Sequence, residues 1–585
     1  MFLPVTKEEM DKLGWQQCDV ILVTGDAYID SPYSGAAVIG HVLLEAGFKV
    51  GVIAQPNILS GGAQAKVEGP GPQNADIARL GEPRLFWGVT GGCVDSMVSN
   101  FTVLKKPRRS DDFTPGGENN KRPNRAVIAY SNLIKHNFKN TRPIVLGGIE
   151  ASLRRMAHYD YWQDGIRKSI LFDSKADFLI YGMGEKAVVE LAKVLDETEN
   201  LKLKTESGNE ESFQKIKGLC YISNKIPEGY IELPSFDAVI KDKAKFIEAF
   251  GIMYDNNDPG RAKGLAQKQD TRYLIQNPPA DNLTAEELDK VHELPYEYDA
   301  HPYYAQMGHI KALDTIKFSI TSHRGCYGEC NFCAITSHQG RIVTSRSEAS
   351  ILREVEKLAK LPGFTGNIYD VGGPTANMYG ISCSKIKGGH CGVKNCLYPK
   401  VCDNLANEHE RQIKLLEQIR AVKGVKKVFI GSGIRHDMVV ADKKYGEKYL
   451  RQVVEHHVSG QIKLAPEHSR EKVLKLMRKP GIKSLLEFKD RYYMINGETG
   501  KKQFLTYYII AAHPGCEERD MRYLKEFLDR ELKAHPEQVQ VFTPAPGTWS
   551  SVMYWTEMDP FTGTKVFVEK TNKGKERQKK IIKPE

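Results

Sequence analysis

The sequence predicts an α/β protein with a Rossmann-like front domain followed by a full or partial barrel of six βα units. Two observations carry this prediction. Strand-sized apolar runs alternate with amphipathic helical segments over residues 1–200, and the same alternation resumes after residue 315. Such alternation favours parallel sheets, whose ligands bind at the carboxyl ends of the strands. The 585 residues accommodate three or four domains, and 41% hydrophobic with 27% charged residues excludes a disordered or fibrous chain.

The front domain, residues 1–200, is predicted from apolar runs and glycine turns. Strands are predicted at 19–25 and 50–56, with a helix between them at 34–48. Two units, each an apolar run followed by a glycine turn and a helix, are predicted at 142–152 and 176–195. The glycines of the last two units either contact a ligand or permit tight turns. Asp26, Tyr28 and Asp30 follow the first strand at the same ligand edge, with helix capping as the competing role for Asp30. Residues 105–125 are polar and rich in Pro and Gly, which predicts an exposed loop.

Residues 201–310 are irregular and are predicted to form a connecting subdomain, in which Thr284 and Glu287 form a capping box. The barrel is assigned to residues 311–550, with a cysteine-rich insertion at 380–405, and residues 551–585 form a C-terminal extension. The barrel strands are predicted at 316–322, 366–373, 426–433, 460–468, 503–515 and 538–546, and the helices between them at 347–361, 406–422, 446–458, 469–479 and 517–533. The site of such a barrel is built at the carboxyl ends of its strands.

The eleven cysteines are the unusual feature of this composition. An odd number, spread unevenly, argues against a disulfide framework. Seven of them fall between residues 326 and 402 in two groups, whereas Cys18, Cys93, Cys220 and Cys516 stand apart. Clustered thiols in a reducing compartment are more often metal ligands or catalytic groups.

The first group, Cys326, Cys330 and Cys333, has the spacing C-x3-C-x2-C and directly follows the first predicted barrel strand. Thiolates suit iron–sulfur centres, and three protein ligands leave one iron of a four-iron cluster open for chemistry. The alternative is a zinc site with His323 or His338 as fourth ligand. Zinc ligands usually come as separated pairs, so the compact triplet favours the iron–sulfur cluster.

With this triplet, the chain resembles the radical S-adenosylmethionine superfamily, most closely its YgiQ-type group. The motifs that carry the resemblance are GDAYIDSP (25–32), GGIEASLRR (147–155), QNPPA (276–280), ELPYEY (293–298), SGIRHD (432–437), KLAPEH (463–468), KPG (479–481) and AAHPG (511–515). The resemblance implies a radical SAM barrel whose three cysteines ligate a [4Fe-4S] cluster. The open iron would chelate S-adenosylmethionine, and one electron would release methionine and a 5′-deoxyadenosyl radical that abstracts hydrogen from a substrate which the sequence does not identify. An electron donor such as flavodoxin or ferredoxin is implied as partner.

The resemblance also assigns cofactor-binding residues at the other strand ends. Phe332 matches the aromatic residue that contacts the adenine, and Glu467 matches a position that binds ribose hydroxyls. The remaining matches are Gly372 and Gly373 beside the methionyl amine, and Ser432 and Arg435 near the ribose and the carboxylate. Thr375 is not a match to the family motif, but it could supply a hydroxyl in place of the motif's carboxylate. Because the chain reads GGPTAN where the family has GGE, the carboxylate contact of that motif is missing. For each residue, packing at the barrel rim is the competing explanation.

The second group, Cys383, Cys391, Cys396 and Cys402, lies in the insertion after the second barrel strand. Four thiols form a complete ligand set, which is typical of a structural zinc ion or an auxiliary iron–sulfur cluster. The sequence predicts a second metal site here and leaves the metal open.

The front domain resembles the cobalamin-binding modules that precede many radical enzymes. The loop after its first strand lacks the D-x-H-x-x-G signature and offers no axial histidine. Two interpretations stay open, cobalamin bound without a histidine and a Rossmann-like domain that serves only substrate, and we favour the second.

The net charge of +10 arises from 83 Lys+Arg against 73 Asp+Glu, and the last 21 residues hold 8 basic and 3 acidic groups. Half of the excess positive charge therefore lies in a C-terminal tail, which is predicted to be flexible. Because the tail accounts for so much of this charge, nucleic acid is a less favoured partner. The sequence has no membrane-length apolar run and no secretory signal, which predicts a cytoplasmic protein without a membrane partner. We predict a radical S-adenosylmethionine enzyme. The alternative is a non-catalytic zinc or iron–sulfur protein that binds nucleic acid or a protein partner.

Overall fold

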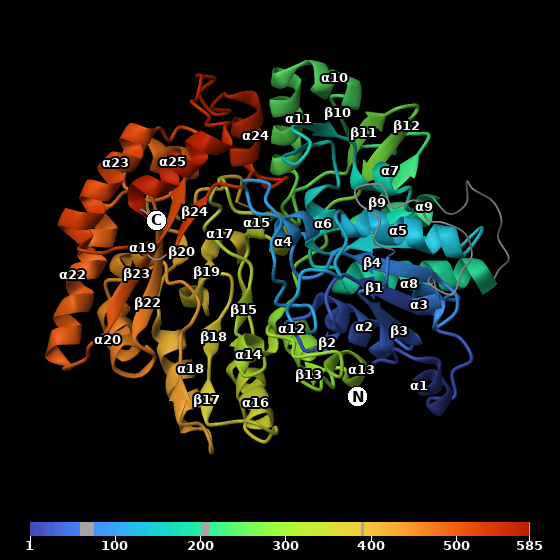
Figure 1. The fold of residues 1–585 in the computed structure, drawn as a ribbon, viewed down its shortest axis with the longest axis horizontal. Coiled ribbons are helices and arrows are strands. Elements are labelled where there is room, and N and C mark those ends of the chain that lie inside the picture. Colours follow the sequence, from blue (N-terminus) through green and yellow to red (C-terminus); the bar gives the residue numbers. More distant parts are fainter. Residues whose placement is uncertain (59–74, 201–209, 388–390, 537, 584–585) are drawn as a thin grey trace. The chain divides into compact units, whose positions relative to one another are not determined.

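The computed structural model describes residues 1–58, 75–200, 210–387, 391–536 and 538–583 (Figure 1). The chain forms two compact units, one of residues 1–281 and 293–317 and the other of residues 282–292 and 318–585. No helix in the described ranges is both long and apolar enough to span a membrane.

The first unit is built on a nine-stranded sheet. In spatial order its strands are β10 (Ile231–Leu233), β11 (Leu265–Gln269), β12 (Arg272–Gln276), β9 (Leu219–Ser223), β8 (Phe178–Ile180), β5 (Ile144–Gly147), β4 (Phe86–Thr90), β1 (Val20–Thr24) and β3 (Val50–Ala54). The five strands from β8 to β3 are parallel, as the βα alternation predicts, and β1 is buried along its whole length. Parallel strands that are covered on both faces become continuous apolar runs such as VILV.

The segment predicted as a connecting subdomain joins this sheet. Strand β9 pairs antiparallel with β8, and β12 and β11 continue the same sheet beyond it. The structure therefore has two compact units where the sequence predicted four segments, because residues 219–276 extend the front sheet by direct strand pairing. The short pairs β2 (Ile29–Asp30) with β13 (Asp299–Ala300) and β6 (His158–Asp160) with β7 (Gly165–Arg167) complete the strands of this unit in its described part.

The helices of the first unit follow the strands in chain order. They are α1 (Lys7–Lys12), α2 (Gly35–Glu45), α3 (Ala75–Ala78), α4 (Ser96–Asn100), α5 (Ala126–Asn137), α6 (Gly148–Leu153), α7 (Ile170–Ser174), α8 (Glu185–Asn200), α9 (Glu210–Lys215), α10 (Phe236–Lys241), α11 (Lys243–Asp255), α13 (Pro302–Ala305) and α14 (Leu313–Ile316). Ser34 is the N-cap residue of α2, so the capping role considered for Asp30 is wrong.

The second unit is a partial barrel of parallel strands. Strand β14 (Ser319–Thr321) pairs with β18 (Asp370–Gly372), and β17 (Asn367–Ile368) pairs with β21 (Lys427–Val428). A bridge from Ile434 to Leu464 leads to β22 (Gln461–Glu467), which pairs with β23 (Phe504–Ala511), and β23 pairs with β24 (Val539–Val541). All these pairings are parallel and follow the predicted order. The carboxyl ends of the strands therefore lie along one rim.

The other elements of the second unit connect these strands. They are β15 (His323–Arg324), β16 (Thr344–Ser345), β19 (Ser382–Cys383), β20 (Leu405–Ala406), α12 (Ala285–Glu293), α15 (Ile335–Gln339), α16 (Glu348–Leu358), η2 (Ala376–Met378), α17 (Ser384–Lys387), α18 (Glu410–Ala421), α19 (His436–Ala441), α20 (Gly446–His456), α21 (Glu471–Met477), α22 (Lys483–Glu498), α23 (Glu518–Phe527), η3 (Leu528–Leu532), α24 (Trp549–Thr556) and α25 (Asn572–Ile582).

The prediction of a flexible basic tail is wrong. Residues 572–582 form helix α25, which packs against α23, β23 and β24, as the red helix of Figure 1 shows. Lys575 and Gln578 are buried, and the Lys575 ammonium donates to the Tyr554 hydroxyl at 2.9 Å. Only two buried polar side chains and a glycine face the core, so the helix lacks the apolar stripe by which such a helix is recognised in a sequence.

Candidate functional site

The first cysteine group lies in the loop between β15 and α15, at the rim of the barrel. The loop is fixed by its backbone: the Asn331 N–H donates to the Met477 carbonyl at 3.0 Å, and the Ser550 N–H donates to the Asn331 carbonyl at 2.9 Å. Gly325 opens the loop with φ +84°, and a Cβ there would lie 2.1 Å from the Ile342 carbonyl oxygen. Glycine is therefore required at this position.

The three thiols of this loop are close to one another. Burial, together with the neighbouring Cys330 and Cys326 thiols, raises the pKa of Cys333 to about 12, because a thiolate next to other thiolates is unfavourable. The Gly328 N–H donates to the Cys326 sulfur at 3.4 Å. Such a set of crowded, partly buried thiols fits an iron–sulfur cluster, whose iron ions would bind the thiolates and offset their mutual repulsion.

In the described ranges, no group of three or more His, Cys, Asp or Glu side chains surrounds a point as the ligands of a single metal ion do. The zinc site considered as the alternative at this triplet would take its fourth ligand from His323 or His338. His323, a candidate ligand of that zinc site, is fully buried with its Nδ1 beside the Ser322 hydroxyl at 2.9 Å.

Arg435 lies beside the cysteine loop, directly before α19. Its Nη1 is 3.8 Å from the Cys330 sulfur, and its Nε and Nη2 donate to the two carboxylate oxygens of Asp437 at 2.8 and 2.5 Å. Burial alone would raise the pKa of Asp437, but the charge and hydrogen bonds of Arg435 outweigh it and lower the pKa to about 2. The pair is therefore ionised, with its cationic face toward the thiols.

Gly372, which ends β18, and Gly373, which follows it, have different surroundings. A Cβ on Gly373 would lie 2.7 Å from the His323 ring, whereas a Cβ on Gly372 would meet the Ser432 hydroxyl at 3.1 Å. The Gly372 carbonyl accepts from both the N–H and the hydroxyl of Ser322, at 2.7 and 3.0 Å. The Thr375 hydroxyl is 3.6 Å from the Cys326 sulfur, so this residue does reach the cysteine loop.

Ser432 follows β21 and is bound to a residue that the sequence interpretation did not select. Its hydroxyl donates to a carboxylate oxygen of Asp370, and its N–H donates to the other oxygen at 3.1 Å. The Gly431 N–H donates to the same oxygen at 2.8 Å. Asp370 thus fixes the strand end on which Ser432 lies.

Glu467 ends β22 in a left-handed conformation with φ +67°. Its side chain is buried, and burial raises its pKa although Lys479 and Arg435 lower it. Lys479 is also buried and donates to the Ala465 carbonyl at 2.5 Å. A largely buried acidic residue held in a strained backbone conformation at a strand end is typical of a ligand-binding position.

Phe332 is half-buried, and its ring lies edge-on to that of His513 with the centroids 6.2 Å apart. His513 belongs to the AAHPG motif after β23, so two of the motifs that carried the resemblance meet here. The structure thus places Phe332, Thr375, Arg435 and Glu467 around the cysteine loop or at neighbouring strand ends. Asp437, Asp370 and Lys479 were missed, although Asp437 and Lys479 lie inside the SGIRHD and KPG motifs.

The second cysteine group lies in the insertion between β19 and β20. Cys383 and Cys396 are buried in an apolar cluster that also contains Tyr327, and Cys326 packs against this cluster. Burial raises the pKa of Cys396 to about 12, with the Glu329 carboxylate and the Cys383 and Cys391 thiols contributing. Residues 388–390 of the insertion lie outside the described ranges.

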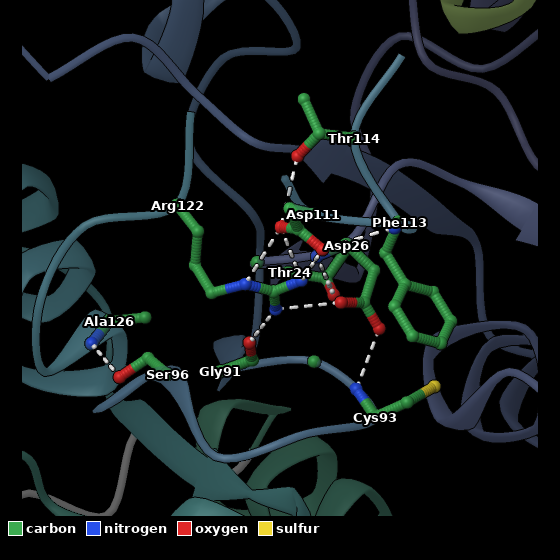
Figure 2. A network of polar contacts seen from close by, with 12 residues as sticks. Thr24, Asp26, Gly91, Cys93, Ser96, Asp111, Phe113, Thr114, Arg122 and Ala126 are labelled. Atoms are coloured by element: carbon green, nitrogen blue, oxygen red, sulfur yellow. Dashed lines mark hydrogen bonds and ion pairs between the residues drawn. The ribbon is translucent and has the colours of Figure 1, made fainter. Parts of the chain in front are cut away.

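At the carboxyl edge of the first unit's sheet, polar side chains form a buried network (Figure 2). Arg122 pairs with Asp111 at 3.0 Å and with Asp26 at 2.7 Å, and it donates to the Gly91 carbonyl at 2.6 Å. The Cys93 N–H donates to Asp26 at 2.6 Å. Arg122 and Asp111 come from the segment predicted as an exposed loop, which therefore folds back onto the sheet in part.

Tyr28 and Asp30 form a separate buried group in the first unit. Asp30 accepts from the Tyr28 hydroxyl at 3.1 Å, and the His41 Nε2 lies 2.7 Å from the same carboxylate oxygen. All three side chains are buried. This group has the character of a core network and not of a ligand site.

Comparisons with known proteins show the family and the fold of the chain. Residues 2–319 match the family model described as Radical SAM N-terminal. The chain is 54% identical over 583 residues to a UPF0313 protein of Fusobacterium nucleatum, which covers 99% of this chain and 98% of that protein. It is 50% identical over 583 residues to a UPF0313 protein of Thermotoga maritima, which covers 100% of this chain and 98% of that protein.

A solved structure with a similar fold is the radical S-adenosylmethionine methyltransferase TsrM from Kitasatospora setae, with cobalamin and a [4Fe-4S] cluster bound. The TM-score is 0.52 with 14% identity, and the alignment covers 92% of this chain and 78% of TsrM. At this identity the likeness shows a common fold, with a parallel sheet and a partial barrel in one chain.

Proposed function

The chain belongs to the radical S-adenosylmethionine enzymes of the UPF0313 family, and from this premise we propose that it cleaves S-adenosylmethionine reductively and abstracts hydrogen from a substrate. The observation that carries this proposal is the meeting of three thiols with the Arg435–Asp437 pair at the barrel rim. Cys326, Cys330 and Cys333 would hold a [4Fe-4S] cluster, which would supply a coordination site for S-adenosylmethionine and one-electron reduction of its sulfonium.

Arg435 has a defined part in this chemistry. With its Nε and Nη2 held by Asp437, only its Nη1 edge faces the thiols. Arg435 can therefore stabilise negative charge at Cys330 or hold the carboxylate of S-adenosylmethionine through Nη1. Asp437 limits the positive charge that this region receives, because it neutralises the guanidinium.

Glu467 is proposed to accept hydrogen bonds from the ribose hydroxyls of S-adenosylmethionine. Its left-handed backbone aims the side chain away from the regular path of β22. Burial raises the pKa of Glu467, and the nearby Lys479 and Arg435 oppose this shift. Phe332 is proposed as the adenine contact, with His513 supporting the ring edge-on. Gly372, Gly373, Thr375 and Ser432 complete the proposed binding set.

For the first unit we propose a role in substrate binding without cobalamin. The segment after β1 contains no histidine between Gly25 and Pro32, and the edge beside it is occupied by the Asp26–Arg122–Asp111 network. A reduced flavodoxin or ferredoxin is the proposed electron donor, and the cytoplasm the proposed location. Anaerobic purification from cells supplied with cobalamin tests the first point, because bound cobalamin in the visible spectrum would contradict it.

The main test is the formation of 5′-deoxyadenosine. Anaerobically reconstituted protein, reduced with dithionite in the presence of S-adenosylmethionine, is expected to be brown and to form this product. Replacing Cys326, Cys330 and Cys333 by Ala should abolish product and colour, whereas Cys93→Ser, at an exposed thiol of the first unit, should leave both unchanged. Product from the triple variant would refute the site. A colourless protein that contains only zinc would favour the non-catalytic alternative.

A further inference from the structure

The insertion after β18 is closed at its base and has little regular structure inside. Strands β19 and β20 pair antiparallel, with Ser382 opposite Ala406 and Cys383 opposite Leu405. Between them, one turn of helix, α17, is the only regular element in the described residues of the insertion. The described part of the insertion thus has little regular structure of its own, and small cysteine-rich segments of this kind obtain their order from metals or disulfides.

The backbone brings the four cysteines of this insertion toward its base. Cys383 lies on β19 itself, and Cys402 donates its N–H to the Cys396 carbonyl at 2.8 Å. The Leu405 N–H donates to the Cys402 carbonyl at 3.0 Å, which places Cys402 one turn from the residue that pairs with Cys383. The thiols of Cys383 and Cys391 both lie within electrostatic range of Cys396.

A cation lies beside this group. Arg341 Nη1 is 3.9 Å from the Cys396 sulfur, and its Nη2 donates to the Cys391 carbonyl at 2.8 Å. Arg341 is buried, with about one-twentieth of its surface exposed. A buried guanidinium in contact with one cysteine and bonded to the backbone of another suits a centre that carries excess negative charge, as four thiolates around a metal do.

The insertion also contacts the loop of the first cysteine group. Tyr327, which follows Cys326, is buried in the same apolar cluster as Cys383 and Cys396. The carboxylate of Glu329, which precedes Cys330, contributes to the raised pKa of the Cys396 thiol. Tyr327 and Glu329 therefore lie toward the second group, whereas Gly328 between them lies against the triplet thiols.

We propose that Cys383, Cys391, Cys396 and Cys402 form a closed four-thiolate metal centre, either a single zinc ion or an iron–sulfur cluster, that braces the loop carrying Cys326, Cys330 and Cys333. In the structure the Cys391 thiol donates to the Val393 carbonyl at 3.1 Å. Among the described residues no three side chains enclose a single metal ion, so metal binding must reorient at least two of the four thiols, Cys391 among them. This centre holds no open position and has no step in the proposed reaction.

The experiment measures metal bound by the full chain in which Cys326, Cys330 and Cys333 are replaced by Ala. One sample is demetallated and titrated with Co²⁺, whose tetrathiolate complex absorbs strongly in the visible region. A second sample is reconstituted anaerobically with Fe²⁺ and sulfide. We expect about one cobalt ion per chain with a tetrathiolate spectrum if the centre is a zinc site, or about four iron atoms per chain if it is a cluster. Neither result depends on the proposed reaction.

A second variant guards against misfolding of the first. Cys396→Ser/Cys402→Ser keeps the triplet intact, and it should bind less metal than the parent chain. The difference should equal the cobalt or iron that the triplet variant binds. Cys93→Ser, at an exposed cysteine, should bind as much metal as the parent. Circular dichroism establishes that each variant is folded. The proposal is overturned if the folded triplet variant binds neither cobalt nor iron, or if the double variant and the parent bind equal amounts.

Discussion

The carboxylate of Asp437 holds the guanidinium of Arg435 at two points, with Nε to Oδ1 at 2.8 Å and Nη2 to Oδ2 at 2.5 Å. The backbone of Arg435 is fixed as well, because Asn377 accepts from its N–H at 2.8 Å and donates to its carbonyl at 3.1 Å. The remaining nitrogen, Nη1, is therefore kept 3.8 Å from the Cys330 sulfur. The position of one positive charge next to the proposed cluster is thus set by side chains that do not touch the thiols.

Asp437→Asn should have two effects. The buried Arg435 loses its counter-charge, and breaking a buried ion pair from one side costs about 3–5 kcal/mol, which urea denaturation will measure. The reconstituted cluster should have a more positive midpoint potential, because an uncompensated positive charge stabilises its reduced state. Redox titration followed by electron paramagnetic resonance measures that potential.

The matched control for this variant is Asp490→Asn, since the Asp490 carboxylate in α22 is mostly exposed and contacts only Lys489 at 3.3 Å in the described structure. It should change neither the potential nor the free energy of unfolding by more than about 0.5 kcal/mol. If Asp437→Asn shifts the stability but not the potential, Asp437 has only a structural role.

Gly373→Ala should destabilise the protein more than Gly372→Ala. The added Cβ at residue 373 would lie 2.7 Å from the ring and 2.8 Å from the backbone oxygen of His323, which is fully buried and cannot move away. At residue 372 the nearest atom is the Ser432 hydroxyl at 3.1 Å, which can rotate. Overpacking of this kind costs about 1–3 kcal/mol, and urea denaturation of both variants measures it. If both variants lose the same free energy of unfolding, the contact with His323 is not the reason why residue 373 is a glycine.

The strand ends and the cysteine loop could be predicted because their signals are local in the sequence. The C-x3-C-x2-C spacing, the apolar runs and the glycine turns each lie within a few residues. The partners of Arg435 and Ser432 show the limit of this approach. Asp437 is near in sequence, but Asp370 reaches Ser432 only because β17 and β21 pair in one register. The register of two paired strands cannot be predicted from the spacing of residues in the sequence.

Stability should fall on acidification, in part because of His457. Burial lowers its pKa to about 4, and its Nδ1 lies 2.7 Å from the Val428 carbonyl oxygen. In the unfolded chain the pKa of histidine is about 6.5, so the unfolded state binds the proton first, and stability is lost as the pH falls from about 6.5 to 4. His457→Asn should reduce the difference in unfolding free energy between pH 7 and pH 5 by about 2 kcal/mol.

Urea denaturation at the two pH values measures this difference. His535→Asn is the control, because its side chain is exposed and stays in solvent whether or not the chain is folded. The assignment fails if His457→Asn and the parent lose the same free energy between pH 7 and pH 5.

Gln578→Ala tests whether the C-terminal helix α25 is a structural part of the barrel. The Gln578 side chain accepts from the Ala512 N–H at 2.9 Å and donates to the Cys516 carbonyl at 3.0 Å. Ala512 follows β23 with φ +58°, and its neighbour His513 contacts the ring of Phe332. The substitution leaves a buried donor and a buried acceptor without partners, and each such group costs about 1–3 kcal/mol.

We therefore expect Gln578→Ala to lower the unfolding free energy by about 2–4 kcal/mol in urea denaturation, although alanine has the higher helix propensity. Lys579→Ala, at the exposed neighbouring position, should leave stability within about 0.5 kcal/mol of the parent. If the C-terminal residues formed the flexible tail that composition alone suggests, both substitutions would leave the free energy of unfolding almost unchanged. Because Ala512 lies between β23 and the residue that supports Phe332, Gln578→Ala should also weaken binding of S-adenosylmethionine to the reconstituted protein, which equilibrium dialysis measures. Unchanged stability would show that α25 does not hold this strand end.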